Sequence, residues 1–473
     1  MFAKRLLAAA IPAALALPFS FNAHAGVSLI GIGQISGSDL SGLNGTLENG
    51  APANTLGGLG SAIAWAGGDT FLLTPDRGPN ASAWNSSVDN TTSWIPRFQT
   101  LNLGLSTTAF SAGSITSLNP VLNSTTLLSS SAALNYGSAP VLTGSNGEHY
   151  FTGRSDAFAT GTSTNPNNAR LDLEGIRVAA DGKSVYISDE YGPYIYRFDR
   201  STGERTGVIT LPEKFAATTP AATESSEIAA NTSGRVTNKG MEGLAITPDG
   251  KTLVGVMQSP LAQDGGTAAS TVRIVTIDLA TGKVPHEYAY QLDNIGTAAK
   301  PKYGSISEIV AINDHEFIID ERDGKGLGDD SKAVQKKLYT INLSGAQDVS
   351  NDTGAAALTG KAVTKTLFVD LVALLKANGY TDRTIPAKIE GLAFGPDVWV
   401  DGVLQHSLIV VNDNDFLDMV DVNGTLTANP NQFFVLGITD DVLASFQAQQ
   451  IPEPATLALA ALGLTGFMLR RRK

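Results

Sequence analysis

The chain is 473 residues long, contains no cysteine and carries a formal net charge of −12 at neutral pH. Its 42% hydrophobic content is too high for a disordered chain, and its length suffices for a large buried core. The lack of cysteine excludes disulfides, thiolate zinc sites, iron–sulfur clusters and a cysteine nucleophile. The acidic balance argues against a nucleic-acid partner, because such binding requires clustered lysine and arginine. We therefore expect a folded, acidic protein.

The N-terminal residues have the pattern of an export signal. Lys4 and Arg5 precede an apolar run over residues 6–17, and residues 23–25 (Ala-His-Ala) have the small-x-small form of a cleavage site. This arrangement predicts a secretory signal peptide over residues 1–25 that is removed during export by the Sec machinery. An uncleaved anchor is the alternative, but the apolar run is shorter than the ~20 residues that span a bilayer.

Residues 26–450 are expected to form one domain built mainly of strands. Short apolar or β-branched runs alternate with turns rich in Gly, Asn, Asp and Pro, a pattern typical of all-β sandwiches, barrels and propellers. The clearest helical pattern covers residues 367–376, and residues 378–379 (Asn-Gly) supply its C-cap. The sequence therefore predicts an all-β fold with one short inserted helix.

Internal repetition selects the propeller among these all-β folds. Four segments each combine an apolar strand that starts near a glutamate, a turn, and a second apolar strand. Their glutamates are Glu174, Glu242, Glu308 and Glu390, spaced 66 to 82 residues apart. A weaker first copy over residues 56–77 lacks the glutamate. Repeats of this length suit four-stranded propeller blades.

The blade count follows from the spacing of these repeats. Five copies can be counted, and the gap between the weak first copy and Glu174 is about two repeats long. This gap has room for one further blade, although a single loop-rich blade would also fill it. The sequence therefore predicts a single β-propeller of about six blades, within a range of five to seven.

The C-terminal residues 451–473 have the pattern of a second targeting signal. Pro452-Glu453-Pro454 is followed by fifteen residues without a charge, 455–469, and then by the basic end Arg470-Arg471-Arg472-Lys473. The apolar stretch is marginal as a permanent anchor, and its basic end should stay on the cytoplasmic side. This tripartite tail resembles the PEP-CTERM sorting signal of Gram-negative bacteria. The resemblance implies processing by an exosortase, transient membrane anchoring, and a final location at the cell surface or in the extracellular matrix.

Hairpin geometry gathers the repeated acidic residues at one end of the propeller. In an antiparallel hairpin the start of the first strand lies beside the end of the second, and the innermost strands line the channel. We therefore expect the four repeat glutamates at one channel mouth. The charged groups expected close to them are Asp76, Arg77, Asp189, Glu190, Glu321, Arg322 and Asp413.

So many carboxylates at one mouth repel one another unless something neutralises them. A bound Ca²⁺ would do so, because it takes roughly six to eight oxygen ligands. The predicted metal ligands are Glu174, Asp189, Glu242, Glu308, Glu321, Glu390 and Asp413. The alternative is structural: each glutamate accepts backbone N–H bonds and fixes its blade to the next. The two roles can coexist.

Several motifs around these residues resemble one known family. They are DLEGI at 172–176, ISDEYGPYIYRFD at 187–199, NKGMEGL at 238–244, QSPL at 258–261, ERD at 321–323, KIEGL at 388–392 and NDNDF at 412–416. Together they resemble the phytase-like family, also called esterase-like activity of phytase, over residues 57–416. The resemblance implies phosphomonoester hydrolysis, by analogy with calcium-dependent β-propeller phytases. The chain departs from the pattern in its first repeat, which lacks the glutamate.

Other catalytic signatures fail. Residues 182–184 and 250–252 look like P-loop endings, but Arg177 and Ala245 stand where such loops require glycine. The sequence has no Gly-x-Ser-x-Gly elbow. The histidines that remain after export lie outside the repeated blocks, so neither a serine-esterase triad nor a histidine metal site is supported.

Three functions fit the candidate residues. The favoured one is a Ca²⁺-dependent phosphomonoesterase, because two arginines stand beside the predicted carboxylates. The second is a non-catalytic surface propeller that uses Ca²⁺ structurally and binds matrix polysaccharide or another protein. The third is a lactone or ester hydrolase with the same metal-activated water. In the first, Glu174, Glu242, Glu308 and Glu390 hold metal and orient water, while Arg77, Arg322 and Lys239 hold phosphate oxygens.

Overall fold

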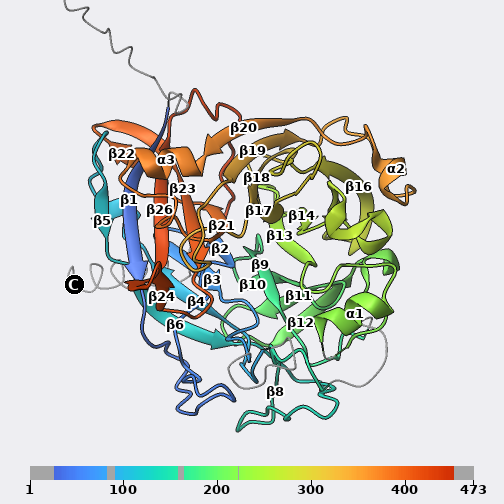
Figure 1. Cartoon of the computed structure of the whole chain (residues 1–473). Helices are drawn as coiled ribbons and strands as arrows, with labels where there is room; N and C mark the ends of the chain where they lie inside the picture. Colours follow the sequence, from blue (N-terminus) through green and yellow to red (C-terminus); the bar gives the residue numbers. More distant parts are fainter. Residues whose placement is uncertain (1–25, 82–90, 158–164, 222, 452–473) are drawn as a thin grey trace, which may run out of the picture.

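The computed structural model describes residues 26–81, 91–157, 165–221 and 223–451. The expected signal peptide over residues 1–25 and the sorting tail from residue 452 onward lie outside the described residues. Five sheets of antiparallel strands stand around a common axis (Figure 1), so the predicted all-β propeller is confirmed. In the part of the chain that the structure describes, no helix is long and apolar enough to cross a bilayer.

Each blade has four strands that follow one another from the channel outward. Blade 1 contains β2 (Ala62–Trp65), β3 (Thr70–Thr74), β4 (Arg97–Asn102) and β6 (Val121–Leu127); blade 2 contains β9 (Leu173–Val178), β10 (Ser184–Asp189), β11 (Tyr194–Asp199) and β12 (Arg205–Thr210). Blade 3 contains β13 (Met241–Ile246), β14 (Thr252–Met257), β15 (Thr271–Asp278) and β16 (Lys283–Gln291). Blade 4 contains β17 (Ser305–Ala311), β18 (Glu316–Arg322), β19 (Lys336–Asn342) and β20 (Lys365–Asp370).

The N-terminal strand closes the ring. Blade 5 contains β21 (Lys388–Phe394), β23 (Val403–Asp413), β26 (Asn431–Ile438) and, as its outer strand, β1 (Val27–Ile35). β1 pairs antiparallel with β26 from Val27 opposite Ile438 to Ile35 opposite Asn431. The two ends of the domain are therefore joined within one sheet, which closes the ring.

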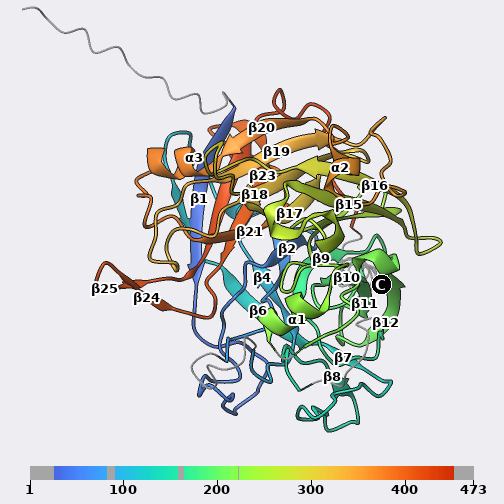
Figure 2. The same cartoon turned by 45° about the vertical axis from the view of Figure 1, so that its right-hand side comes forward.

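The blade count is five, within the predicted range of five to seven. The described part of the long gap before Glu174 holds no further blade. Its described part contains β6, the short β5 (Thr116–Leu118), which pairs with β1, and the two-residue strands β7 (Ser129–Ser130) and β8 (His149–Tyr150). The loop-rich alternative was therefore the correct one. Smaller additions are β22 (Val398–Val400) and the hairpin of β24 (Met419–Val422) and β25 (Thr425–Ala428), which projects from the body in Figure 2.

The predicted helix exists but starts later than expected. Residues 365–370 form β20, and helix α3 (Leu371–Ala377) follows. Asp370 ends the strand and caps the helix, since its side chain accepts a hydrogen bond from the Ala373 N–H at 2.9 Å. Asn378 forms the predicted C-cap. Two further short helices, α1 (Glu224–Ala230) and α2 (Ala355–Leu358), lie in the described loops.

The apolar core is divided among the interfaces between neighbouring blades. One buried cluster lies between each adjacent pair, such as Phe98 with Ile187 between blades 1 and 2, or Ile63 with Ile409 between blades 5 and 1. The glycine after the repeat glutamate permits this packing. A Cβ on Gly243 would lie 2.9 Å from the backbone of Glu308, so the innermost strands approach closely only because that position is glycine.

An ion pair between Arg177 and Glu308 bridges the channel. Arg177 Nη2 lies 3.1 Å from Glu308 Oε1, and both side chains are buried. The guanidinium also donates to the carbonyl oxygens of Ile63, Ile176, Ile309 and Leu392, while Glu308 accepts from the N–H groups of Leu244 and Ile309. These bonds connect the innermost strands of all five blades at mid-channel. Glu308 therefore does not lie at the mouth, contrary to the expectation from its spacing.

Candidate functional site

A pocket of about 290 Å³ occupies one mouth of the channel. Its walls come from the starts of the first strands and the ends of the second strands, as the hairpin geometry predicts. Seven carboxyl groups and four basic groups line it. The lining residues are Ser61, Asp76, Arg77, Asn80, Glu174, Glu190, Asn238, Lys239, Glu242, Gln258, Ser305, Arg322, Gly324, Lys388, Glu390, Asp413 and Asp415.

Strand register identifies two equivalent positions in every blade, and all of these residues except Ser307 line the pocket. Glu174, Glu242 and Glu390 each stand directly before the glycine of their first strand. In blade 4, Glu308 pairs with Asp320 as Gly243 pairs with Val256, so Ser307 occupies the glutamate position. The second position is on the second strand. It lies two residues after the residue that pairs with that glycine, or with the residue that replaces the glycine in blades 1 and 4. The two sets are Ser61, Glu174, Glu242, Ser307 and Glu390, and Asp76, Glu190, Gln258, Arg322 and Asp413.

Three predicted metal ligands lie outside this pocket because each is one residue out of register. Successive side chains of a strand point to opposite faces, so a shift of one residue moves a side chain away from the mouth. Glu308 points into the channel. Asp189 instead accepts the N–H groups of Asp172, Tyr191 and Gly192. Glu321 accepts from Tyr290, Gln335, Lys365 and the Asp293 N–H at the side of blade 4.

The three repeat glutamates at the mouth, Glu174, Glu242 and Glu390, differ in the charged and polar groups that surround them. Glu390 forms an ion pair with Arg322 of the preceding blade. Glu242 Oε1 accepts a bond of 2.7 Å from Gln258 Nε2, but its buried Oε2 has no hydrogen-bond partner among the described residues. Burial, and then the negative charges around them, raise the pKa of both Glu174 and Glu242 well above the usual value. The positive charge of Arg322 only partly offsets this effect at Glu242.

Two groups of carboxylates are close enough to share one ion. Ligand oxygens of Asp172, Glu174 and Glu190 lie within 4.8 Å of one another, as do those of Asp76, Asp413 and Asp415. Lys388 already neutralises the second group, since its Nζ lies 3.2 Å from Asp413 and also contacts Asp415. Burial still raises the pKa of Asp76 to about 6. Arg77 pairs with Asp172 of the first group, but Glu174 and Glu190 form no ion pair among the described residues, so the first group, beside Glu242, is the better place for a metal ion.

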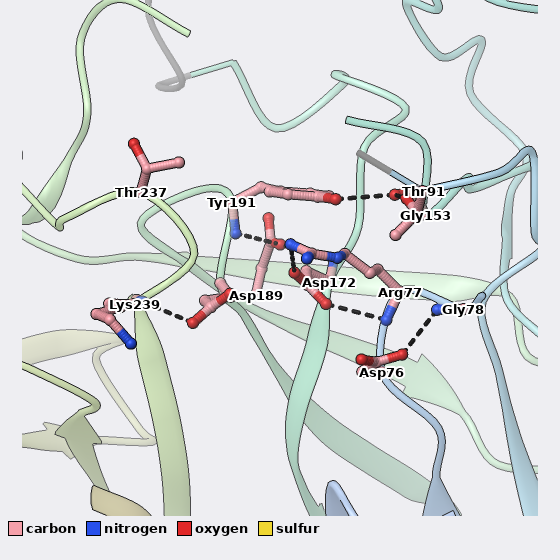
Figure 3. A network of polar contacts seen from close by, with 12 residues as sticks. Asp76, Arg77, Gly78, Thr91, Gly153, Asp172, Asp189, Tyr191, Thr237 and Lys239 are labelled. Atoms are coloured by element: carbon pink, nitrogen blue, oxygen red, sulfur yellow. Dashed lines mark hydrogen bonds and ion pairs between the residues drawn. The ribbon is translucent and has the colours of Figure 1, made fainter. Parts of the chain in front are cut away.

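The basic residues of the pocket differ in how tightly they are held. Arg322 donates to Ser307 at 2.8 Å and pairs with Glu390, so it links blades 4 and 5. Arg77 lies beside Asp172, which accepts its backbone N–H at 3.0 Å and its Nη1 at 3.4 Å (Figure 3). Lys239 donates to Gln258 at 3.1 Å. Arg77 and Lys239 are thus better placed than Arg322 to meet an anion.

A smaller pocket of about 80 Å³ adjoins the first and shares Arg77 and Asn238 with it. Arg77, Arg170 and Arg235 line it, and Arg235 pairs with Glu227 at 2.7 Å. Burial lowers the pKa of Arg170. The carboxylate pocket therefore has an arginine-rich neighbour.

Sequence reasoning missed several residues of the site. Lys388, Asp415, Asp172 and Asn238 all lie within the family motifs, but spacing alone gave them no role. Ser61 and Ser307 carried no chemical signal, because serine is common on turns and strand ends. Arg177 is the only basic residue inside the first strand of its repeat, and that isolation was a usable signal.

Buried carboxyls should make the metal-free protein less stable as pH rises. Burial raises the pKa of Asp189 to about 7, whereas the same group in an unfolded chain titrates near 4. Between these values the folded state binds more protons than the unfolded state, so the free energy of unfolding falls with increasing pH. We expect the melting temperature in EDTA, measured from pH 4.5 to 7.5, to fall relative to that of Asp189→Asn. Parallel curves would contradict this.

The sequence matches known proteins at both family and chain level. Residues 54–416 match the phytase-like family, described as esterase-like activity of phytase, and residues 450–473 match the PEP-CTERM protein-sorting motif. An uncharacterized secreted protein of Arthroderma benhamiae is 31% identical over 218 residues, 41% of each chain. The chain thus spans about two-fifths of that relative's length.

Solved structures with low sequence identity also align with the chain. The periplasmic gluconolactonase of Pseudomonas aeruginosa is 11% identical, covering 88% of this chain and 99% of its own, with a TM-score of 0.34. The PQQ-bound aldose sugar dehydrogenase of Streptomyces coelicolor is 10% identical, covering 87% and 94%, with a TM-score of 0.31. The family match is the informative one: it covers well over half of the chain and includes every repeat, and by it this protein belongs to the phytase-like family.

Proposed function

We propose that this protein is an exported, surface-sorted phosphomonoesterase that depends on Ca²⁺ bound in the carboxylate pocket. The family is named for an esterase-like activity, and the sorting motif provides for export. The observation that carries the metal is Glu242 Oε2, a buried carboxylate oxygen without a partner among the described residues, beside Glu174. An unpaired buried carboxylate costs several kcal/mol unless a cation or proton compensates it.

The donor set fits Ca²⁺. The carboxylates of Asp172, Glu174, Glu190 and Glu242 and the side-chain carbonyl of Gln258 offer oxygen ligands, which Ca²⁺ prefers and accepts in irregular arrangements. These residues would hold the ion. When bound, Ca²⁺ supplies a Lewis acid that polarises a phosphoryl oxygen and makes a nearby water more acidic.

The remaining residues suggest how the reaction would proceed. Arg77 and Lys239 would hold phosphate oxygens at the rim of the pocket. A water that attacks phosphorus must lose its proton, and Asp76, whose pKa is raised to about 6 by burial, can accept one near neutral pH. The P–O bond to the alcohol breaks, and the alkoxide takes up a proton as it leaves. The arginine-rich pocket next to Arg77 supports a substrate that carries a second anionic group.

One observation favours a non-catalytic propeller as the second candidate. The pocket has seven carboxyl groups against four basic groups, and Arg322 and Lys388 are already paired. Such a pocket attracts cations more strongly than phosphate esters. In that case Ca²⁺ would fix the blades, and a polymer or protein would be the partner.

Ca²⁺ should both stabilise the protein and permit turnover. A ligand at about 100 times its dissociation constant adds roughly 2.7 kcal/mol to the free energy of unfolding. We therefore expect Ca²⁺ to raise the melting temperature by several degrees over the EDTA form, and phosphate release from p-nitrophenyl phosphate and phytate to require it. Stabilisation by Ca²⁺ without any phosphate release would favour the non-catalytic propeller. Hydrolysis of a lactone or a carboxylic ester, but of no phosphomonoester, would favour the third function. A melting temperature that Ca²⁺ does not raise would refute the metal site.

A further inference from the structure

The end of the channel opposite the carboxylate pocket is covered by the C-terminal segment. Phe446, Gln447, Ala448 and Gln449 line a pocket of about 50 Å³ there, together with Arg177 and the ends of the innermost strands. Leu443 is buried under this segment, and Ile451 packs against the core of blades 1 and 2. The chain is therefore seated on the propeller up to the residue before Pro452.

Specific contacts hold this segment on three blades. Gln449 Nε2 donates to the carbonyl of Val178 at 2.7 Å, at the end of blade 2's first strand. The Gln447 N–H donates to the carbonyl of Ile312 at 2.8 Å, just past the first strand of blade 4. The ring of Phe446 lies 4.4 Å from that of Phe394 in blade 5. We call this seated stretch, residues 443–451, the C-terminal seal.

The seal and the carboxylate pocket lie at opposite ends of the same strands. Glu242 stands at the start of β13, and Ile246, which lines the pocket under the seal, stands at its end. Four steps along the strand separate Glu242 from Ile246 by about 13 Å, at roughly 3.3 Å per residue. The Arg177–Glu308 pair lies between them.

The sorting tail leaves the seal with little slack. Gln449 is the last residue with a side-chain bond to a strand end, and the uncharged run begins at Ala455. A fully extended chain covers at most about 3.6 Å per residue, so these six steps reach no farther than about 22 Å. While the uncharged run is in the bilayer, the seal must stay close to the membrane surface.

We propose that the anchored protein stands on the membrane with its sealed end toward the lipid and its carboxylate pocket facing away. The short tether imposes this orientation. The hairpin turns of blades 2 to 4 around the seal are polar, with Lys183, Lys251 and Asp314 exposed, whereas the β22–β23 hairpin of blade 5 exposes Trp399, Val403 and Leu404. Substrates would reach the pocket from the side away from the membrane, which disfavours the lipids of the anchoring bilayer.

The absence of cysteine permits a direct test. The full chain, made in a host without exosortase, would be reconstituted into vesicles that contain a fluorescent acceptor lipid. A donor dye would be attached to single cysteines at Lys183→Cys or Lys251→Cys on the sealed face, or at Lys325→Cys on the pocket face, all exposed positions. We expect clearly higher energy transfer from the first two positions than from the third.

A lengthened tether provides the matched control. Twenty Gly and Ser residues inserted after Ile451 would give a tether with an end-to-end distance of about 25 Å or more, and the difference between the two faces should then shrink or vanish. Equal transfer from all three positions of the unmodified chain would overturn the proposed orientation. Absence of transfer from every position would overturn its premise, the insertion of the tail. Neither result depends on catalysis or on Ca²⁺.

Discussion

Replacing Arg177 with methionine is expected to lower the free energy of unfolding by about 3–5 kcal/mol, the usual cost of breaking a buried ion pair. The change removes the guanidinium that pairs with Glu308 at 3.1 Å and donates to carbonyls of four first strands. It leaves a buried carboxylate and several carbonyls without donors, while methionine fills most of the volume. Chemical denaturation monitored by tryptophan fluorescence would measure the loss.

Arg197→Met is the matched control for this prediction. Arg197 pairs with Asp181 at 2.8 Å in the same blade, but both side chains are about two-fifths exposed. Surface pairs of this kind contribute only about 0–1 kcal/mol. A midpoint for Arg177→Met as high as that of Arg197→Met would show that the channel pair does not hold the blades together.

The fold was largely predictable because its signals are local. Each blade repeats an apolar strand, a turn and a second apolar strand, and such repeats have few other ways to bury their apolar faces than stacking around an axis. The blade count was less certain, because residues 103–172 contain strands too short to distinguish from loops. The start of the helix was misplaced by four residues, because residues 367–370 are apolar enough for either state and pairing with β19 decides for the strand.

The site was predictable to within one residue, and that residue matters. Comparison of the repeat sequences aligned Glu308 with Glu242, but the strand pairing places Ser307 at the position equivalent to Glu242. The same one-residue shift separates Asp189 from Glu190 and Glu321 from Arg322. Pairing register depends on bulges in the first strands, such as the one between Met241 and Gly243, and a bulge leaves no clear mark in the sequence.

The structure also changes the role expected for Arg322. The sequence predicted that Arg322 holds phosphate oxygens of the substrate. Its contact with Glu390 and its bond to Ser307 make it a link between blades 4 and 5. Removing it would leave Glu390 buried without its cation, so a loss of activity in Arg322 variants would not by itself identify a substrate contact. Arg77 and Lys239 are the better residues for that purpose.

Glu242→Gln is expected to affect stability and activity in opposite directions. Glutamine keeps the shape and can still accept the bond from Gln258, but it removes a buried charge that Glu190 and Glu390 repel. In EDTA the variant should therefore melt at the same temperature as the wild type or higher. In saturating Ca²⁺ the wild type should gain stability and the variant should gain much less, because the ion loses its charged ligand. Titration calorimetry with Ca²⁺ would measure the affinity directly.

On the proposed function, kcat/KM of Glu242→Gln for a phosphomonoester should fall at least a hundredfold, which corresponds to about 2.7 kcal/mol of transition-state stabilisation. Glu213→Gln is the control: it makes the same chemical change at an exposed glutamate outside the pocket and should alter neither value. If Glu242→Gln melts lower than the wild type in EDTA, Glu242 is a structural hydrogen-bond acceptor. If it retains full Ca²⁺ affinity, the ion does not use this carboxylate. If Ca²⁺ affinity falls but turnover is unchanged, Ca²⁺ does not take part in the reaction. Its role would then be to connect neighbouring blades.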